Sequence, residues 1–419
     1  MTEASKTPGT RPAGRVLGVL LVAVLVGFTA QQLLTPILAP LSRELRLSEV
    51  QLGIVITVAA VVFTLGSIVW GRIVDVWGSR RVLLTGLGIA LVGMVGFGLA
   101  CRIALDAGWG TPATLTALLA TRSVLFGTGI GAVPVAALAY VSAATTGEQE
   151  RTKAISLVGA AQAVSLIVGP GVGGALAVAD LLAPVYLAPV LLVVVMVLVL
   201  VMVPGLDRSA PARDIPGRVG PLDGRVRPFL LVGFLLFLSL GVMQVVLGFL
   251  VQDRLDLDAG ATAASVGTAM VVCGLVLVVM QAAVVPKLGW APARLIRVGA
   301  PVAVVGYVLL ALADQLWLIT AGLCVVALGL GMAMPGYSAG ATLRVDRTEQ
   351  GAVAGLLNAT SGATFIVGPL LGTALYDLGP AVPVWVSAAC CVVGTVVALA
   401  GRALTTPDRA APAAGGGIT

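Results

Sequence analysis

Histidine is absent from this sequence, and charged residues are scarce. None of the 419 residues is His, which excludes His-based catalysis, His metal sites and a His proton relay. Charged residues make up 11% of the chain, whereas soluble globular domains carry about 25%. The five cysteines lack CxxC spacing, so they indicate neither a disulfide framework nor a zinc site. We therefore expect no metal, no cofactor and no enzymatic activity.

Apolar residues dominate instead, at 58% of the chain. One aqueous core cannot bury this much apolar surface, so lipid has to solvate it. The net charge is +6, but the basic residues are scattered singly and form no stripe with interleaved aromatics of the kind that binds nucleic acid. The expected partner is therefore the lipid bilayer, and no nucleic acid.

Long apolar runs predict the transmembrane helices. A helix needs about 20 residues to cross the hydrocarbon core, and the first run is too long for the core of a signal peptide. The sequence predicts an all-α polytopic membrane protein with 12 transmembrane helices. The runs cover 15–38, 51–71, 82–104, 113–142, 153–179, 184–204, 228–251, 262–285, 294–313, 317–340, 351–376 and 382–402.

A repeated segment divides the chain into two halves. Ile167–Leu176 reads IVGPGVGGAL and returns 199 positions later, at Ile366–Leu375, as IVGPLLGTAL. Duplicated halves in an apolar chain are typical of solute carriers whose site lies between the repeats. We expect two pseudo-symmetric six-helix bundles. The predicted boundaries are 1–14 for a cytoplasmic tail, 15–204 for the first bundle, 205–227 for a cytoplasmic linker, 228–403 for the second bundle and 404–419 for a disordered tail.

The basic residues predict the orientation. If both termini are inside, the inner segments carry 20 of the 25 Lys and Arg residues, and the outer loops carry Arg43, Arg46, Arg102 and Arg254. Because cytoplasmic loops are enriched in Lys and Arg, this bias predicts an N-in/C-in topology. The remaining basic residue, Arg122, falls within a span.

The loop between the second and third predicted spans carries a specific pattern. Its members are Gly71, Asp75, Gly78, Arg80 and Arg81. The glycines suit a tight turn, and Asp75 lies near a predicted helix start, where the helix dipole favours a carboxylate. Taken alone, the loop could be a basic inner loop with an incidental acid.

In full, the pattern G-x-x-x-D-x-x-G-x-R-R resembles the loop signature of the major facilitator superfamily, and the resemblance extends from about residue 15 to 402. It implies a cytoplasmic latch between the two halves. Val76 replaces the commoner basic residue after the Asp, and the equivalent loop in the second half, Pro286–Arg294, has no acid. The expected latch is therefore one-sided.

Arg122 lies in the fourth predicted span, before Gly127 and Gly129. A basic residue within the membrane marks a functional site by default, although its side chain could also extend toward the interface. The spacing R-x-x-x-x-G-x-G is similar to the family's fourth-span motif. That resemblance implies an Arg that faces the central cavity and takes part in substrate or proton coupling.

The fifth predicted span carries Gly169, Pro170, Gly173 and Gly174. Proline kinks a helix, and glycines let a neighbouring helix approach closely. This segment is similar to the motif of exporters in the family, particularly drug:proton antiporters. The second copy, at Gly368 and Pro369, is equally compatible with simple helix packing.

Polar side chains inside the other spans predict the lining of a central cavity, because such groups generally face the bundle interior. By analogy with the family, the cavity-facing amides are Gln31, Gln32, Gln162, Gln244 and Asn358. Phe28, Phe126, Phe237, Met243 and Tyr337 could add an adaptable apolar lining, and each of them is also compatible with plain packing.

These observations favour a secondary active exporter that moves a small hydrophobic or amphipathic molecule by alternating access, in exchange for protons. We expect a monomer in a bacterial cytoplasmic membrane. The alternative is an importer or uniporter of a small metabolite or sugar on the same fold. No Asp or Glu lies in the middle of a span. Either a boundary acid (Asp75, Asp180, Asp253 or Asp314) carries the proton, or Arg122 exchanges a charged substrate, or no ion is coupled.

Overall fold

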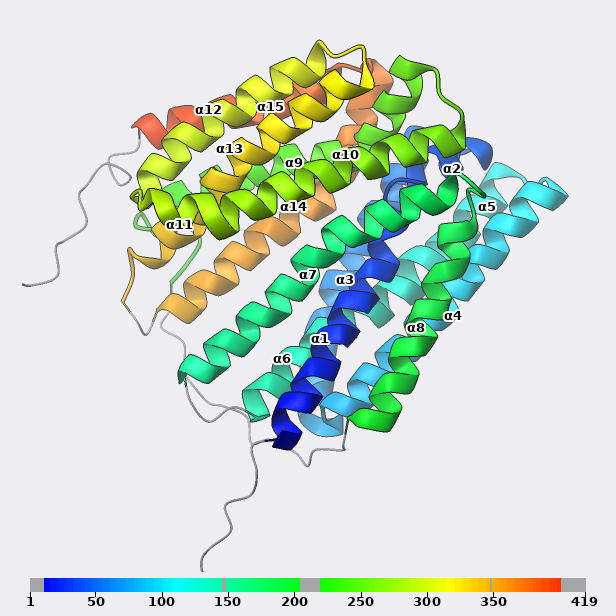
Figure 1. The fold of residues 1–419 in the computed structure, drawn as a ribbon, viewed down its shortest axis with the longest axis horizontal. Coiled ribbons are helices and arrows are strands. Elements are labelled where there is room, and N and C mark those ends of the chain that lie inside the picture. Colours follow the sequence, from blue (N-terminus) through cyan, green and yellow to red (C-terminus); the bar gives the residue numbers. More distant parts are fainter. Residues whose placement is uncertain (1–10, 145–147, 204–218, 347–348, 401–419) are drawn as a thin grey trace, which may run out of the picture.

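The computed structural model describes residues 11–144, 148–203, 219–346 and 349–400, and in these ranges the long elements are all helical (Figure 1). Eleven helices in the described part are long and apolar enough to cross a membrane, and the first helix adds an apolar stretch at Val16–Gln32. The all-α membrane fold is confirmed. Residues 1–10, 204–218 and 401–419, which include most of the predicted linker and tails, lie outside the described residues.

The first bundle contains α1 (Arg11–Gln32), α3 (Glu49–Trp77), α4 (Ser79–Ala107), α7 (Glu148–Ala177) and α8 (Ala183–Met202). Its remaining span is continuous from α5 (Thr111–Leu118) through a π-helical turn, η1 (Leu119–Leu125), to α6 (Phe126–Ala144). The second bundle contains α9 (Arg227–Leu255), α12 (Pro292–Ala311), α13 (Leu316–Thr342), α14 (Gln350–Leu378) and α15 (Val382–Ala400). Its second span joins α10 (Ala259–Val279), η2 (Met280–Val284) and α11 (Val285–Leu288).

The first predicted span is broken in the structure. We expected a helix over 15–38, but α1 ends at Gln32, and turns lead into the short helix α2 (Leu38–Glu44). Pro36 lies in these turns, where it supplies no backbone N–H for a continuing helix. The break lets α2 lie at the end of the bundle and contact α9 and α10 of the other half.

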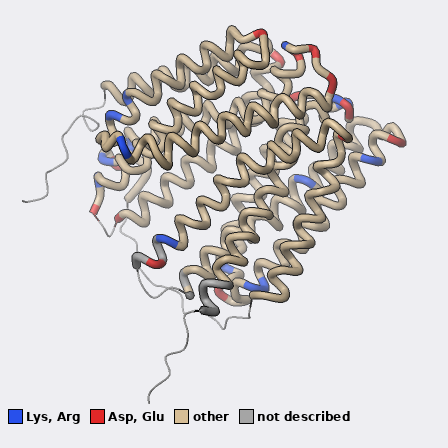
Figure 2. Tube along the Cα trace, in the orientation of Figure 1, with Lys and Arg blue, Asp and Glu red and all other residues tan. Residues whose placement is uncertain are grey.

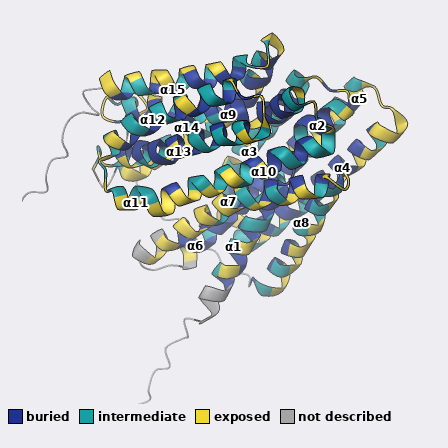
Figure 3. Cartoon of the chain, turned by 45° about the horizontal axis from the view of Figure 1, so that its top comes forward, coloured by how far each residue is buried: buried dark blue, intermediate teal, exposed yellow. Residues whose placement is uncertain are grey.

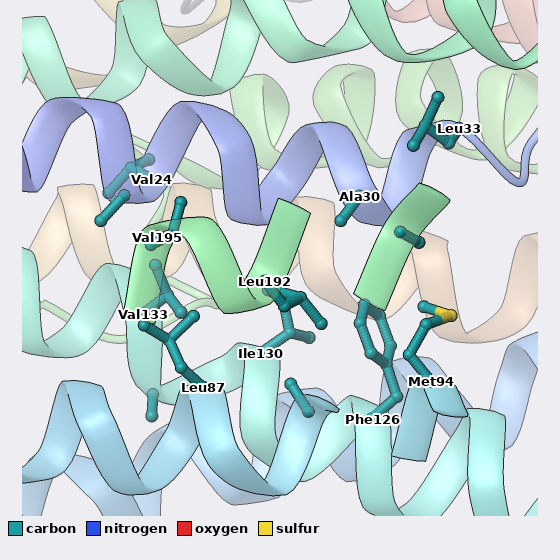
Figure 4. Packing of buried hydrophobic residues seen from close by; sticks show 14 of the residues in the cluster. Val24, Ala30, Leu33, Leu87, Met94, Phe126, Ile130, Val133, Leu192 and Val195 are labelled. Carbon is teal, nitrogen blue, oxygen red and sulfur yellow. The ribbon is translucent and has the colours of Figure 1, made fainter. Parts of the chain in front are cut away.

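Each bundle has its own apolar core. In the first, Phe126 of α6 is fully buried near Met94 of α4 and Ala30 of α1, and Leu192 and Val195 of α8 pack from another side (Figure 4). In the second, the hydroxyl of Tyr307 donates to that of Ser239 over 3.1 Å inside an otherwise apolar cluster. Most buried apolar residues of each half therefore pack within their own bundle.

The molecule has two polar ends. The linker end is the one where the chain passes from α8 to α9, and the α2 end is the opposite one. Figure 2 shows the charged residues gathered mainly at these ends, with the intervening lengths of the helices largely uncharged. Basic residues prevail at the linker end, including Arg72, Arg80 and Arg81, whereas acids such as Asp180, Asp253 and Asp314 gather at the α2 end. This separation matches the basic bias that predicted the topology.

The bundles meet at the α2 end and separate toward the linker end. The contacts between them are made by α3 with α14, by α7 with α10, and by α2 with α9 and α10. The buried residues of α7, α10 and α14 lie mainly toward the α2 end, and the linker-end parts of these helices are exposed or partly exposed (Figure 3). On α3 the residues between the two ends are mostly partly exposed, and Trp70 and Val74 are buried near the linker end. In the most apolar stretches of these four helices only 11% to 22% of residues are buried, against 28% to 67% in the other spans. A gap therefore lies between the bundles and opens at the linker end.

Candidate functional site

The inner face of α14 can be identified from its two neighbours. Gly368 packs against Gly241 of α9, and Thr373 packs against Gly53 of α3 in the other bundle. At 100° per residue, Asn358 and Phe365 point between these two directions, and Asn358 is exposed. Both residues therefore face the gap between the bundles.

The inner face of α9 follows from the same reasoning. Phe237, Gln244 and Gly248 recur at helical spacing, and Gly248 meets Ala39 of α2 in the other half. Gln244 is exposed although its neighbours Met243 and Val245 are buried. Its amide therefore faces the gap, one turn from the contact between the halves.

The first helix, α1, places a second group on the gap. Gln32 faces α7, where it meets Gly169, and Gly27 packs against Ile130 of α6. Phe28 and Gln31 lie on the face between these contacts. Oε1 of Gln31 is buried with no hydrogen-bond partner in the described protein, so this acceptor is unsatisfied in this conformation.

Aromatic rings stand on this inner surface in both bundles. Phe28 and Phe63 meet edge to face with 6.5 Å between ring centroids. In the second bundle Phe237 makes similar contacts with Tyr337 at 6.0 Å and with Phe365 at 6.4 Å. Because sequence reasoning considered spans singly, it missed Phe63 and Phe365, which become neighbours of the predicted residues only in the folded bundle.

Other predicted residues are packed inside the bundles. Phe126 has no exposed surface, while Met243 is 5% and Tyr337 is 3% exposed. The Tyr337 hydroxyl donates to the carbonyl oxygen of Leu357 over 3.2 Å, which fixes its ring. Gln32 is buried at the α7 crossing. In this conformation these four residues support the inner wall from behind.

The glycines of α7 serve two contacts on two faces. A β-carbon on Gly173 would overlap the carbonyl oxygen of Leu33, directly after the end of α1, and one on Gly169 would lie 3.1 Å from Cα of Gln32, the last residue of α1. On another face, a β-carbon on Gly174 would lie 2.7 Å from the carbonyl oxygen of Ala263 on α10. The segment thus holds α7 between its own bundle and the opposite one.

Pro170 belongs to the second contact, because its carbonyl oxygen would lie 2.6 Å from a β-carbon on Gly267 of α10. Gln162 lies two turns from Gly169 on the α1 side of the same helix and is partly exposed. In the second copy of the repeat, Gly368 and Gly372 pack in the same way on α9. There Thr373 takes the position of Gly174 and meets the opposite bundle.

Arg122 lies in the π-helical turn η1 and is 8% exposed. Its guanidinium lies over the ring of Phe126, 4.9 Å from the centroid. Nε is buried without a hydrogen-bond partner, and Arg122 is in none of the ion pairs of the described residues. A π-helical turn inside an α-helix often marks a functional position. Here the turn contains an arginine that has no carboxylate partner among the described residues.

The residues around Arg122 explain its motif. Gly127 approaches α3, where its β-carbon would lie 3.2 Å from the carbonyl oxygen of Ala59. Gly129 approaches α4, where its β-carbon would lie 2.8 Å from Cα of Ala90. The Ser123 hydroxyl donates to the carbonyl oxygen of Val55 over 2.6 Å. The glycines and the serine therefore fix this span between its neighbours and hold Arg122 in place.

The loop signature lies at the linker end, with its parts arranged differently from our expectation. Gly71 is inside α3, and the turn itself is at Gly78, which has a φ of 79°. Asp75 belongs to the last turn of α3 and not to a helix start, and it is exposed. Among the described ion pairs it takes no part in any.

The basic residues of the signature also stay within the first bundle. Nη2 of Arg80 donates to the carbonyl oxygen of Leu200 on α8 over 2.8 Å, while Arg81 is exposed. Within the part of the chain that the structure describes, the residues of the signature make no ion pair or hydrogen bond with the second bundle.

The exposure of Asn358 gives a direct test of the gap. We expect a cysteine at Asn358 to react with a membrane-impermeant thiol reagent that is applied from the linker side, because this position faces an opening to water. The matched control is Val367→Cys on the same helix. Val367 is 46% exposed but lies on the opposite, apolar face, so lipid should protect it. Equal labelling of both cysteines would contradict the assignment of the gap.

Comparison with known proteins decides the family. A family model described as the Major Facilitator Superfamily matches residues 20–364 and 290–418. The chain belongs to the Major Facilitator Superfamily. Members of this superfamily are transporters and not enzymes, and the protein is accordingly a multi-pass transporter of the cytoplasmic membrane.

Relatives within the superfamily include resistance proteins. The chain is 27% identical over 373 residues to the tetracycline resistance protein, class G, of Vibrio anguillarum. The match covers 85% of this chain and 90% of that protein. It is 24% identical over 375 residues to multidrug resistance protein 2 of Bacillus subtilis (strain 168), covering 86% and 88%. The predicted resemblance to the drug-exporting branch of the superfamily is confirmed.

A solved structure shows the same Major Facilitator fold. A bacterial homologue of the human lysosomal transporter Spinster, in an inward-facing and unoccupied conformation, superposes with a TM-score of 0.74 at 14% identity. The match covers 97% of this chain and 100% of that one.

Proposed function

We propose that the protein exports a small hydrophobic or amphipathic molecule from the cell by alternating access, in exchange for protons. The observation that carries this proposal is the position of α7, whose glycine segment packs on α1 and on α10 and thereby joins the two bundles. That segment is the one that resembles the motif of exporters. The tetracycline and multidrug resistance relatives support the same direction of transport.

The surface of the gap supports the substrate class. Its aromatic residues, Phe28, Phe63, Phe237 and Phe365, offer rings to an apolar body. Gln244 and Asn358 add exposed amides, and the acceptor of Gln31 is without a partner. A lining of aromatic rings with a few amides suits a neutral or weakly polar ligand.

The conformation fits the loading step of an exporter. With the proposed N-in/C-in topology, the linker end is cytoplasmic and the α2 end is outside. The gap is then open to the cytoplasm and closed outside, so a molecule could enter from the cytoplasm or from the inner leaflet. Rocking of the bundles would expose the same surface to the outside.

Proton coupling is the part of the proposal that most needs an experiment, because no carboxylate lies in the middle of a described span. Of the four boundary acids, Asp75 and Asp314 are exposed and take part in none of the described ion pairs, Asp180 accepts from the backbone N–H of Leu182, and Asp253 alone pairs with the other bundle. This scarcity of acids favours the second candidate function, a facilitator without proton coupling.

A flux measurement separates the two functions. Cells with and without the gene are first compared for susceptibility to, and export of, a set of amphiphilic antibiotics. The purified protein is then placed in liposomes with an imposed pH gradient, and flux of the compound found is followed. We expect flux of the compound to rise when the pH gradient drives protons across the membrane in the direction opposite to the movement of the compound. Flux that ignores the gradient would show a facilitator and remove the antiport proposal.

A further inference from the structure

A polar cluster joins the two bundles at the α2 end. Arg43 of α2 donates both terminal nitrogens to the carboxylate of Asp253 on α9, with Nη2 2.9 Å from Oδ2. Nη1 also donates to Oε1 of Gln252 over 3.3 Å, and Nη2 to Oε1 of Glu49 over 3.1 Å. The hydroxyl of Tyr376 on α14 donates to Oδ2 of Asp253 over 2.6 Å. These five residues form the α2-end lock.

Aromatic rings lie beneath the lock and close it toward the gap. The guanidinium of Arg43 lies 5.1 Å from the ring centroid of Phe249, and that ring is 5.8 Å from the ring of Tyr376. Two-pronged pairs between Arg and a carboxylate are stronger and more directional than single contacts. The hydrogen bond from Arg43 to Asp253 is also the main reason that the pKa of Arg43 is raised.

Among the ion pairs whose two partners are both described, the Arg43–Asp253 pair is the one that joins the two bundles. Arg102 pairs with Asp106 inside α4. Arg225 pairs with Asp223, in the segment that precedes α9, and with Glu349 of the second half. Among these described pairs, the contact between bundles therefore lies at the closed end.

Each charge of the pair has a second partner inside its own bundle. Arg43 keeps Glu49, which follows it in the first bundle, and Asp253 keeps the hydroxyl of Tyr376 in the second. When the bundles part, the two-pronged pair breaks but neither charge is left alone. A semi-buried charge without any partner would cost far more free energy than a charge that replaces one of its two contacts by water. The arrangement therefore suits a contact that breaks and re-forms in each cycle.

We propose that Arg43 and Asp253 are the gating residues that hold this transporter closed at the α2 end, and that they separate in each transport cycle. Glu49 and Tyr376 act as positioning residues, which hold each charge in place while the gate is open. The proposal concerns the transport cycle itself and holds for an exporter or an importer, since it depends only on the two ends opening alternately.

The test measures opening without any substrate. Spin labels are attached to cysteines at Glu44 and Leu378 for the α2 end, and at Val76 and Gly351 for the linker end, in a background without the five native cysteines. All four positions are exposed in the structure. In the parent we expect short α2-end distances and long linker-end distances. We expect Asp253→Asn and Arg43→Gln each to lengthen the first set and shorten the second.

A double-mutant cycle separates the gate from general damage. If the two residues act through their mutual contact, Arg43→Gln with Asp253→Asn should shift the distances no further than the larger single change. Tyr376→Phe removes the partner that Asp253 keeps when the gate is open, so it should not open the α2 end, and the α2-end distances should stay as short as in the parent. Arg102→Gln, which breaks the exposed pair within α4 at the same end, is the matched control and should leave both distances unchanged.

Two results would overturn the proposal. One is a parent-like distance distribution in both single variants. The other is a shift in the double variant equal to the sum of the single shifts, which would mean independent structural effects. If one single variant is not inserted in the membrane, the comparison of the other single variant with Arg102→Gln decides, and equal distances in these two would also overturn the proposal. Because no substrate is present, failure of the export screen would leave this result unaffected.

Discussion

Gly174→Ala is expected to force the α2 end open while leaving both bundles folded. The new β-carbon would lie 2.7 Å from the carbonyl oxygen of Ala263 and 3.0 Å from Cα of Gly267, both backbone atoms of α10 in the other bundle. Backbone atoms of a helix cannot move aside singly, and the bundles are separate bodies. An overlap of this kind costs about 1–3 kcal/mol, which would shift an equilibrium between two conformations roughly 5- to 150-fold.

Gly173→Ala, one residue earlier, provides the matched comparison. Its β-carbon would overlap the carbonyl oxygen of Leu33 and lie 2.9 Å from the carbonyl carbon, directly after the end of α1 in the same bundle. Relief then requires two helices of one packed core to separate. We therefore expect Gly173→Ala to lower the thermal stability, and Gly174→Ala to leave it nearly unchanged.

The measurement is the rate at which a cysteine that replaces Thr57 reacts with a thiol reagent, in a protein without its native cysteines. In the structure the Thr57 hydroxyl donates to the carbonyl oxygen of Ile366 across the contact of α3 with α14, 3.0 Å away. A cysteine there should react slowly in the closed form and faster in the Gly174→Ala variant. Unchanged reactivity together with a loss of thermal stability would show that Gly174 is an ordinary packing residue.

The spans and the role of the glycine repeat could be predicted because both depend on local sequence. Runs of about 20 apolar residues specify membrane helices wherever they pack. The glycines of Ile167–Leu176 can only serve close approach of neighbouring helices, and the structure shows that approach on two sides of α7. The family resemblance of the loop signature was likewise confirmed by the family match.

The α2-end lock could not be predicted, because its members are far apart in the chain. Arg43 and Asp253 are separated by 210 residues, and Tyr376 is a further 123 residues away. The sequence predicts Arg43 in an outer loop and Asp253 at a membrane boundary, and no pattern in the sequence joins the two residues. Their contact depends on the turn at Pro36, which positions α2 against α9, and on the closed conformation itself.

The π-helical turn at Arg122 was missed for a different reason. Leu119–Leu125 has the composition of an ordinary apolar helix, and one extra residue in a helical turn leaves no compositional signal. The neighbouring contacts of Ser123 with α3 and of Gly129 with α4 are what the surrounding helices impose on this segment. Such a turn can be seen only once the packing of the bundle is known.

Arg122→Ala is expected to abolish transport and yet leave the protein as stable as before or more stable. A cation in the middle of a membrane helix costs about 2.5–3.5 kcal/mol on insertion scales. The described protein supplies no carboxylate to offset this, and only the ring of Phe126 lies against the guanidinium. Such a contact contributes about 0.5–2 kcal/mol. Removing the cation should therefore leave the free energy of unfolding of the bundle unchanged or raise it.

Transport should change in the opposite direction to stability: flux should fall in Arg122→Ala. If Arg122 pairs with the substrate or a coupled charge during the cycle, its loss costs about 2–5 kcal/mol, which is roughly a 30-fold or greater loss of flux. Arg122→Lys keeps the charge and should retain part of the activity. Arg254 provides the contrast, since it donates to the carbonyl oxygens of Leu310, Ala311 and Ala313 at the end of α12.

Arg254→Ala should accordingly lower the thermal stability by leaving these carbonyl groups unpaired, at about 1–3 kcal/mol. Flux in liposomes and thermal unfolding in detergent, measured for Arg122→Ala, Arg122→Lys and Arg254→Ala, separate the two kinds of arginine. Normal flux through Arg122→Ala, or a fall in its stability like that of Arg254→Ala, would mean that Arg122 only holds its helix in place. A stable and inactive variant would mean that the membrane-buried cation is retained for transport.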